Sequence, residues 1–303
     1  MKIYINKVSE NWVVDRFREE WYLHNKNIST KNFFASDLIW LISPWTFKKG
    51  LLKLLRDKKL IYSIYHIEDD SKQNSLDGIK KIDKFVTGYH TISLKTKLQL
   101  EKVTNKKVFY IPFWIDPTIW FEIEDKSTLF KKYNLDPNNF FVGSFQRDSL
   151  ASNSEKPKLI KGPDIFLENV IELSKIHNNL EVILTGRKRN YLINQLKKNN
   201  IKFKYFEMAT QSEINELYNC LNLYIISSRI EGGPQAIAEC GVTNTPLVST
   251  DVGMAKEFMN PVSIYDEDSF TESKPDNEFL RKKVNSLEIP TGFEEFYKMF
   301  NSI

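Results

Sequence analysis

The sequence predicts an α/β fold built on parallel β-sheets. Short apolar runs of the kind that form buried strands alternate with segments of helical periodicity along almost the whole chain. This alternation is typical of parallel sheets covered by helices. The 303 residues suffice for two domains of ordinary size. A content of 41% apolar residues is enough to give each domain a buried core.

In the first part of the chain, up to Asp116, each apolar run is short and is followed by a helical or polar segment. Strands are expected at 2–6, 37–42, 60–65, 84–87 and 107–112, and helices at 17–23, 46–59 and 91–103.

The segment 46–59 has two readings. Leu51, Leu52, Leu54 and Leu55 can share one face of a helix, with lysine and arginine side chains around the other. Such a helix either lies on an anionic membrane surface or is a crossover helix whose leucines pack on the sheet. We favour the crossover helix.

The second part of the chain repeats the alternation. Strands are expected from 140 and at 180–185, 202–206, 221–226 and 245–250, and helices at 165–176, 191–199, 212–220, from 235, at 279–286 and at 292–300.

The stretch 227–239, SSRIEGGPQAIAE, carries the strongest functional signal. It follows the apolar run 221–226, turns through Glu231 and two glycines, and continues into a helix for which Pro234 is a suitable first residue. A strand, a glycine turn and a helix start present backbone N–H groups to a phosphate. The alternative is an ordinary βα turn with a solvated glutamate.

This stretch resembles the signature of retaining GT-B glycosyltransferases of the family-four, or group 1, class. The resemblance rests on S-x-x-EGGP-x-x-x-x-E and on the following TPLVSTDVG. It implies two Rossmann-like parallel-sheet domains facing a cleft. Residues 1–117, with a C-terminal helix at about 291–303, would form the acceptor-side domain, and residues 118–290 the nucleotide-sugar-binding domain.

The resemblance also assigns the donor site. Glu231 would contact the donor sugar, and Glu239 would bind the ribose hydroxyls of the nucleotide. The amides of the turn Gly232, Gly233 and Pro234 would contact the diphosphate. The loop Met208, Ala209 and Thr210 would lie along the edge of the base.

Fixed cations should stabilise the departing diphosphate, because enzymes of the resembled class use no metal. Gly143 matches the glycine that the family places after the first strand of this domain. Arg147 and Lys161 are the candidate cations, with Lys158 as a rival to Lys161. The alternative for each is a solvated side chain.

His66 is the candidate catalytic residue of the first domain. It follows the predicted strand 60–65, and ligands of α/β sheets gather beyond such strand ends. The resembled family often places a histidine there, close to the reacting centre, and a histidine exchanges protons near neutral pH. A surface or helix-capping histidine is the alternative. The acids 68–70 fit a helix N-terminus better than a metal site.

The early chain departs from the family pattern. The segment 7–16 contains no glycine, and Phe113 and Trp114 replace the usual Asn-Gly before Asp116. Polar and aromatic side chains in 7–16 could instead shape an acceptor pocket: Asn11, Trp12, Asp15 and Arg16.

Charge and composition exclude several classes. Residues 1–115 carry 21 Lys/Arg and 12 Asp/Glu, whereas the whole chain has a net charge of +4. The basic first part indicates an anionic partner, although it is not gathered into a nucleic-acid-binding module. No strand is followed by the GxGxxG of dinucleotide-binding oxidoreductases.

A cytoplasmic protein is expected, with peripheral contact to an anionic membrane as an option. The start of the chain does not resemble a signal peptide, and no apolar run approaches the ~20 residues of a spanning helix. Cys220 and Cys240 have no metal or redox spacing and should be small core residues.

The sequence therefore predicts a metal-independent glycosyltransferase with no cofactor. It would move a sugar from a nucleotide-diphosphate sugar to a glycan, lipid-linked or small-molecule acceptor, with retention of configuration. The alternatives are a nucleotide-sugar epimerase or phosphorylase on the same scaffold, or a non-catalytic nucleotide-sugar-binding protein.

Overall fold

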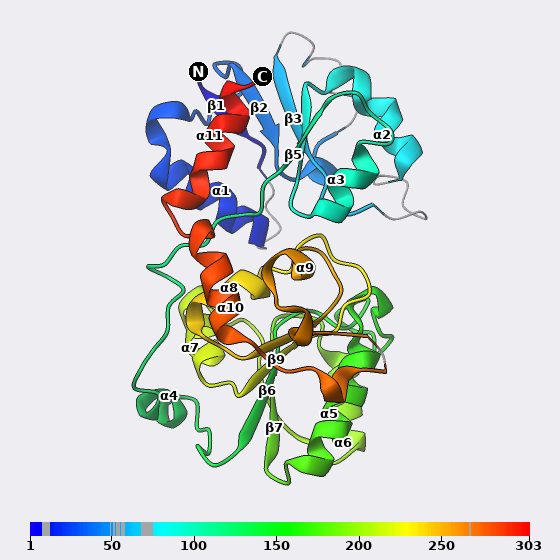
Figure 1. Cartoon of the computed structure of the whole chain (residues 1–303), viewed down its shortest axis with the longest axis vertical. Coiled ribbons are helices and arrows are strands. Elements are labelled where there is room, and N and C mark those ends of the chain that lie inside the picture. Colours follow the sequence, from blue (N-terminus) through cyan, green and yellow to red (C-terminus); the bar gives the residue numbers. More distant parts are fainter. Residues whose placement is uncertain are drawn as a thin grey trace. The chain divides into compact units, whose positions relative to one another are not determined.

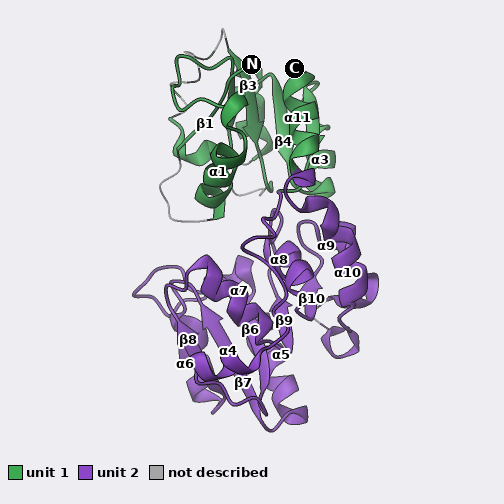
Figure 2. Ribbon diagram, turned by 90° about the vertical axis from the view of Figure 1, so that its left-hand side faces the viewer, with its two compact units in different colours: residues 1–113, 293–303 green, residues 114–292 purple. Residues whose placement is uncertain are grey.

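The computed structural model describes residues 1–7, 13–48, 50, 52, 55, 58–67, 75–266 and 268–303. The chain divides into two compact units, shown in different colours in Figure 2. Unit 1 comprises residues 1–113 and 293–303, and unit 2 comprises residues 114–292. Each unit contains one sheet, and every pairing between named strands is parallel, which confirms the predicted α/β class.

The sheet of unit 1 has five strands in sequential order. They are β1 (Ile3–Ile5), β2 (Leu38–Leu41), β3 (Lys59–Ser63), β4 (Gly88–Thr91) and β5 (Lys107–Tyr110). Within the described residues, the second edge of β1 carries one isolated bridge, between Ile3 and Ser29.

The strand expected at 84–87 is wrong. Lys84 and Phe85 lie in the 3-10 turn η4 (Asp83–Phe85), Val86 and Thr87 follow it, and β4 begins at Gly88. A Cβ atom at Gly88 would lie 3.1 Å from the Phe109 side chain. The first position of β4 thus lies close to β3 and β5, and a residue without a side chain fits there.

Helices cover both faces of this sheet. On the Trp40 face lie α1 (Val13–His24) and α11 (Glu294–Asn301), since Trp40 contacts the rings of Trp21 and Phe300. Successive strand residues face opposite sides, and the opposite face packs against α2 (Leu76–Ile82) and α3 (Leu94–Leu100).

The described leucines of the basic segment 46–59 belong to that second face. Leu52 and Leu55 are buried in the core cluster that contains Ile39 and Leu41. This burial agrees with the crossover reading of the segment. Leu51 and Leu54 lie outside the described residues.

The end of the chain completes the aromatic core of unit 1. In α11 the side chains of Phe296, Met299 and Phe300 are buried. The Trp21 ring centroid lies 5.5 Å from that of Phe293 and 5.4 Å from that of Phe300. Each such buried side chain contributes roughly 1.5–3 kcal/mol to folding, so the last residues are a structural part of unit 1.

The sheet of unit 2 has six strands in the order β11-β10-β9-β6-β7-β8. They are β6 (Phe140–Ser144), β7 (Leu180–Thr185), β8 (Lys202–Phe206), β9 (Leu223–Ile226), β10 (Leu247–Thr250) and β11 (Ile264–Tyr265). The chain builds one side from β6 to β8 and then crosses to β9 on the other side of β6. Ligands of α/β sheets bind at such a reversal, beyond the carboxyl ends of the strands.

Two layers of helices cover this sheet (Figure 1). Val142 packs with α5 (Pro163–Ile176) and α6 (Asn190–Lys198). Phe141, on the opposite face, packs in the cluster of α7 (Gln211–Asn219), α8 (Ala236–Thr243), α9 (Ala255–Phe258), α10 (Asn277–Val284) and α4 (Ser127–Lys132). Cys220 and Cys240 are buried and free, as expected.

No helix within the described residues is both long enough and apolar enough to cross a membrane.

Candidate functional site

The candidate site lies where β6 and β9 end, at the reversal of strand order in unit 2. Gln146 follows β6, Ser227 and Ser228 follow β9, and Lys161 ends the 3-10 turn that precedes α5. Gln146 links them, because its Nε2 donates to the Lys161 carbonyl (3.1 Å) and its Oε1 accepts from Ser228 Oγ (3.3 Å). One carboxamide thus holds three loops together.

Gly162 allows these loops to approach closely. Its φ of +58° lies in the left-handed region, and a Cβ atom would lie 1.7 Å from the Ser227 carbonyl oxygen. Only glycine fits this position, because both the backbone angle and the contact exclude a side chain. The sequence predicts a Lys-Gly pair leading into this helix, and the contact explains why a glycine follows Lys161.

Ion pairing fixes the same two loops from outside. Arg229 makes two hydrogen bonds of 2.8 Å to the carboxylate of Asp164, at the start of α5. The amides of Arg229 and Ile230 both donate to the Ile160 carbonyl. The backbone on either side of Lys161 and Glu231 is therefore held in place.

Two predicted catalytic residues meet at the centre of the site. The Lys161 ammonium forms an ion pair and hydrogen bond with Glu231 Oε1. Their side chains are 17% and 15% exposed, so both reach solvent. Ser228 Oγ also lies 3.2 Å from Glu231 Oε1, so its one hydroxyl proton is shared between this carboxylate and the Gln146 carboxamide oxygen. A cation and an acceptor-only carboxylate, held side by side, can bind an anionic group and sugar hydroxyls respectively.

The glycine turn is packed against a third strand end. A Cβ atom at Gly253, beyond β10, would lie 2.8 Å from Gly233 Cα and 2.9 Å from the Gly232 carbonyl oxygen. The helix after the turn begins at Ala236, and the Ile237 amide donates to the Pro234 carbonyl at 3.0 Å. Pro234 therefore precedes α8 rather than occupying its first position, because the chain makes one further turn before the helix.

Glu239 is buried inside α8. It is 8% exposed, and the Tyr218 hydroxyl donates to its Oε2 at 3.0 Å. Burial, together with Tyr224 and Glu239 itself, raises the pKa of Tyr218 well above its usual value. Tyr218 therefore remains a protonated donor. Glu231 lies in the loop and Glu239 in the helix, so the pair does not share a continuous helix.

Arg147 and Gly143 lie on the β6 side. Gly143 is buried within β6, where a Cβ atom would lie 2.3 Å from the Leu221 side chain. It serves packing in the structure. Arg147 is exposed and makes no ion pair to any residue that the structure describes.

Asp148 and Arg189 form a buried ion pair that sequence reasoning missed. Arg189 Nε lies 3.0 Å from Asp148 Oδ2, with side chains 0% and 3% exposed. Arg189 Nη2 also donates to Ser144 Oγ at 3.2 Å, at the end of β6. Burial raises the pKa of Asp148 against the attraction of Arg189. No local pattern marks Arg189, which stands in a basic stretch and resembles a solvated cation.

This pair anchors the long loop after Arg147. The amides of Asp148 and Ser149 both donate to the Lys188 carbonyl, and an antiparallel bridge joins Ser149 to Pro157. At its end the segment comes back to its start, because the Lys158 amide donates to the Asp148 carbonyl at 2.7 Å. The loop 148–158 thus forms a small hairpin, and Arg147 directly precedes its base.

The loop predicted to read the base is partly engaged already. Met208 is 59% exposed, and Arg187 Nε lies 3.0 Å from its sulfur. Thr210 forms a capping box with Glu213 at the start of α7. The Thr210 amide donates to Glu213 (2.7 Å), and the Thr210 carbonyl accepts from the Ile214 amide (2.8 Å). Ala209 is half-buried against the core of unit 2, so a role of this loop in base recognition stays a prediction.

In unit 1 the predicted residues are dispersed. His66 follows β3 and is half-buried. Arg16 lies on α1 with its Nε 3.6 Å from Glu20 Oε1, and both side chains are nearly buried. Asn11, Trp12 and the acids 68–70 lie outside the described residues. The role of His66 close to the reacting centre remains a prediction.

Among the residues that the structure describes, no group of three or more His, Cys, Asp or Glu side chains could hold a metal ion.

Comparisons with known proteins relate part of the chain to one family. Residues 153–276 match the family model described as glycosyl transferases group 1. Over 142 residues the chain is 27% identical to the lipopolysaccharide core biosynthesis mannosyltransferase LpsB of Rhizobium meliloti (strain 1021). That match covers 45% of this chain and 38% of the relative's length.

Solved structures share the fold over the whole chain. The Anabaena protein Alr3699/HepE, in complex with UDP and glucose, superposes with a TM-score of 0.78 at 14% identity, covering 100% of this chain and 99% of the other. Sucrose-phosphate synthase from Thermosynechococcus elongatus gives a TM-score of 0.70 at 12% identity, covering 98% and 80%. Both likenesses support the predicted GT-B class of fold.

Proposed function

Because residues 153–276 match the family model of the group 1 glycosyltransferases, we propose that this chain transfers a hexose from a nucleoside-diphosphate sugar to an acceptor hydroxyl, with retention of configuration. The observation that carries the proposal is the cluster of Lys161, Glu231, Gln146 and Ser228 at the strand reversal of unit 2. Acceptor-only and cation groups at such a reversal suit a ligand that combines hydroxyls with phosphates.

The donor would bind across this cluster. Glu239 would accept hydrogen bonds from two adjacent ribose hydroxyls, with Tyr218 holding its carboxylate from the other side. The amides of Gly232 and Gly233 would meet the diphosphate before α8. Glu231 would accept from hydroxyls of the sugar.

Transfer breaks the bond between the anomeric carbon and the diphosphate oxygen and forms a bond from that carbon to the acceptor oxygen. The electron pair of the broken bond goes to the diphosphate, so negative charge grows there in the transition state. Lys161 and Arg147 would stabilise this charge, which lowers the barrier more than it tightens binding. The proton of the acceptor hydroxyl passes to the departing diphosphate on the same face of the sugar.

The names of two similar proteins suggest which donors to test first. One Anabaena structure contains UDP-glucose, and LpsB is named a mannosyltransferase of lipopolysaccharide core biosynthesis. We propose a UDP-hexose as the first donor to test and a mannosyl donor as the second. The acceptor would be the hydroxyl of a glycan, a lipid-linked sugar or a small molecule. Unit 1 would bind it, and contact with an anionic membrane would bring lipid-linked acceptors within reach.

A thermal-shift panel tests donor binding. UDP, UDP-glucose and GDP-mannose are each added to the full chain, because a ligand of the native state raises its melting temperature. Stabilisation by one nucleotide and its sugar, absent with free glucose or mannose, supports the donor site. No stabilisation by any nucleotide at millimolar concentration contradicts it.

Turnover is then measured with the stabilising donor and a panel of glycan acceptors. Release of nucleoside diphosphate together with a new glycoside supports transfer, and the proton coupling at the new anomeric centre reports retention. Donor binding without product from any acceptor would favour the non-catalytic nucleotide-sugar-binding alternative. Conversion of the donor sugar itself would favour the epimerase.

A further inference from the structure

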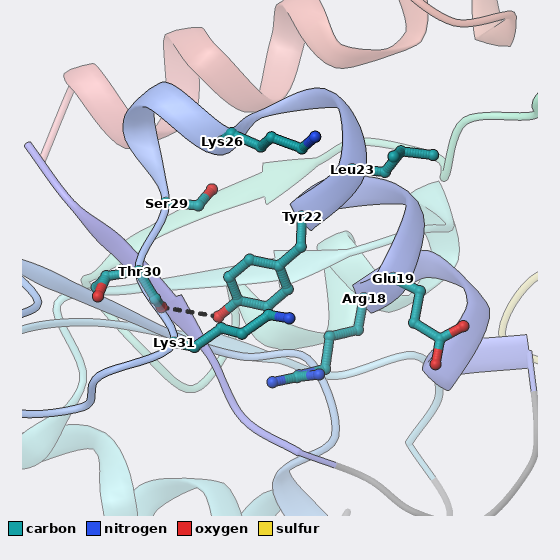
Figure 3. A pocket seen from close by; sticks show the side chains of 8 residues that line it. All are labelled: Arg18, Glu19, Tyr22, Leu23, Lys26, Ser29, Thr30 and Lys31. Atoms are coloured by element: carbon teal, nitrogen blue, oxygen red, sulfur yellow. Dashed lines mark hydrogen bonds between the residues drawn. The ribbon is translucent and has the colours of Figure 1, made fainter.

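A solvent-open groove of about 500 Å³ lies on unit 1, between α1 and the segment 26–31 (Figure 3). It occurs at the free edge of β1, where the isolated bridge between Ile3 and Ser29 is the only pairing beyond β1 among the described residues. The groove therefore occupies a place that a further strand would fill in a wider sheet.

Two side chains of α1 form hydrogen bonds with the backbone N–H and C=O groups of Ile5 at that edge. Tyr22 Oη accepts from the Ile5 amide (3.0 Å) and donates to the Thr30 carbonyl (2.9 Å). Arg18 Nε donates to the Ile5 carbonyl at 3.2 Å. Because the residues are four apart on the helix, both reach the same edge. These hydrogen bonds give Tyr22 and Arg18 a structural role. They do not account for the two lysines that line the same groove, Lys26 and Lys31.

Lysines make the groove basic. Lys26 and Lys31 line it together with Arg18, against the single acid Glu19. Figure 3 shows the Glu19 carboxylate turned away from the Tyr22 ring. Neither lysine ammonium makes a hydrogen bond or an ion pair to any residue that the structure describes.

Two of the three cations lie over one aromatic ring. The Arg18 guanidinium carbon lies 4.8 Å from the Tyr22 centroid, and Lys31 Nζ lies 5.7 Å from it. Cation–π contact stabilises each of them by roughly 0.5–1 kcal/mol at an exposed site. Their mutual repulsion remains, and an anion placed among them would relieve it.

We propose that this groove binds a phosphate-ester group. Three cations against one acid leave the lining with a charge of about +2, which matches a phosphate monoester of −1.5 to −2. The ammonium groups of Lys26 and Lys31 supply donors, and a groove of this size accepts a sugar-sized body beside the phosphate. The site is independent of the proposed transfer and uses none of the residues of unit 2.

The phosphate can come from a soluble sugar phosphate or from a phospholipid headgroup. Leu23, on the wall of the groove, is 60% exposed and could touch acyl chains at a bilayer surface. The chemistry at the lysines is the same in both cases, so the test contains one arm for each source.

Trp21 provides a local signal. Its indole Nε1–H donates to Ser29 Oγ at 2.9 Å, and Ser29 lines the groove. Ligand binding beside Ser29 should therefore shift the Trp21 indole resonance in a ¹H–¹⁵N spectrum. In the first arm glucose 6-phosphate is titrated against the full chain, with glucose as the uncharged control. In the second, sedimentation is compared with phosphatidylglycerol and with phosphatidylcholine vesicles.

The decisive variant is Lys26→Gln combined with Lys31→Gln. Its matched control is Lys95→Gln combined with Lys102→Gln, two exposed lysines of the same unit. We expect the groove variant to weaken glucose 6-phosphate binding, or vesicle binding, at least tenfold, and the control to change it less than twofold. Stabilisation by UDP-sugars should stay the same in both variants.

If both double variants weakened phosphate or vesicle binding equally, the effect would come from the net charge of unit 1, and the proposed site would be overturned. A Trp21 shift of the same size with glucose, or no binding in either arm, would also overturn it. The result is distinct from a failure of the proposed function, because a chain that binds no nucleotide sugar can still bind a phosphate at Lys26 and Lys31.

Discussion

The two units close the ends of their strands in different ways. In unit 1, Asn6 follows β1, and its Nδ2 donates to the Ser43 carbonyl beyond β2 (2.9 Å) and to Thr46 Oγ1 (3.0 Å). In unit 2, Gln146 performs the same linking task between the loops after β6 and β9. Each unit thus uses one carboxamide to link the loops after its strands. Among the residues that the structure describes at these two places, only those of unit 2 add an ammonium and a carboxylate, Lys161 and Glu231.

Unit 1 also contains a chain of buried polar groups inside its sheet. Trp40 Nε1 donates to Ser63 Oγ (2.9 Å), and Ser63 in turn donates to His90 Nδ1 (2.9 Å). His90 Nε2 then donates to the Ile111 carbonyl (2.8 Å), which can only accept. This chain fixes one neutral tautomer and satisfies every member. The comparison teaches that this polar chain of unit 1 serves stability, whereas Lys161 and Glu231 at the strand ends of unit 2 stay within reach of a ligand.

Removing the cation of unit 2 should have the largest effect. We expect Lys161→Ala to lower turnover by about 10²–10³-fold, as the loss of one transition-state donor does. Melting temperature should change little, because the ammonium is partly exposed. Steady-state kinetics with the matching donor measures this, with Lys156→Ala as the control. Normal turnover with a raised KM would assign Lys161 to ground-state binding.

The close contact that builds the site is tested at Gly162. Gly162→Ala should lower the free energy of unfolding by about 3 kcal/mol or more. A non-glycine residue in the left-handed region costs about 1–2 kcal/mol, and the contact with Ser227 must also open. Gly186 is the matched control. Its φ is +83°, but the nearest atom to an added Cβ lies 3.9 Å away. Urea denaturation of both variants should show a much smaller loss for Gly186→Ala. Equal losses would mean that backbone conformation alone explains the glycine.

In unit 1 the corresponding test is pH. Burial lowers the pKa of His90 to about 4, from an ordinary value near 6.5. The unfolded chain therefore binds a proton that the folded chain rejects between these values. Stability from this group is complete above pH 6.5 and falls by about 3 kcal/mol as the pH drops towards 4.

Denaturation at several pH values measures that slope. His90→Gln keeps a donor and an acceptor but cannot titrate, so it should flatten the curve, whereas His24→Gln should leave it unchanged. Donor binding in unit 2 should be the same in both variants. A curve that keeps its slope in His90→Gln would place the titrating group elsewhere.

Glu239 gives the smallest expected effect, and it falls on binding. We expect Glu239→Ala to weaken nucleoside diphosphate binding by about 1.5–3 kcal/mol, because two charge-assisted hydrogen bonds to the ribose are lost. Calorimetry measures the affinity, with the exposed Glu207→Ala as the control. An unchanged affinity with a lower stability would show that Glu239 supports the fold through Tyr218 and does not bind the nucleotide.

The sequence predicts the parts of unit 2 that local chemistry encodes. The strand before Ser227, the glycine turn and the following helix all form as expected, because β-branched and apolar runs, glycines and a proline act over a few residues. Helix α2 was missed, since Gly78 interrupts it and only Ile79 and Ile82 mark its buried face.

What the sequence does not encode locally are the contacts between distant segments. Lys161 and Glu231 were each predicted for the site, but their direct pairing is a contact across 70 residues. The pair of Asp148 and Arg189 is a similar case, since each residue stands among other charged residues and only burial distinguishes it. Periodicity reports which face of an element is buried, not which polar side chain meets it there.

The capped edge of β1 has a consequence for the behaviour of the chain in concentrated solution. A free sheet edge is a template on which a second molecule can add its own strand, and growth of this kind leads to aggregates. Here the donor and the acceptor of Ile5 are already occupied by Tyr22 and Arg18. An arriving strand would have to displace both side chains before it could pair. The same two residues that border the groove therefore protect the molecule against uncontrolled self-association.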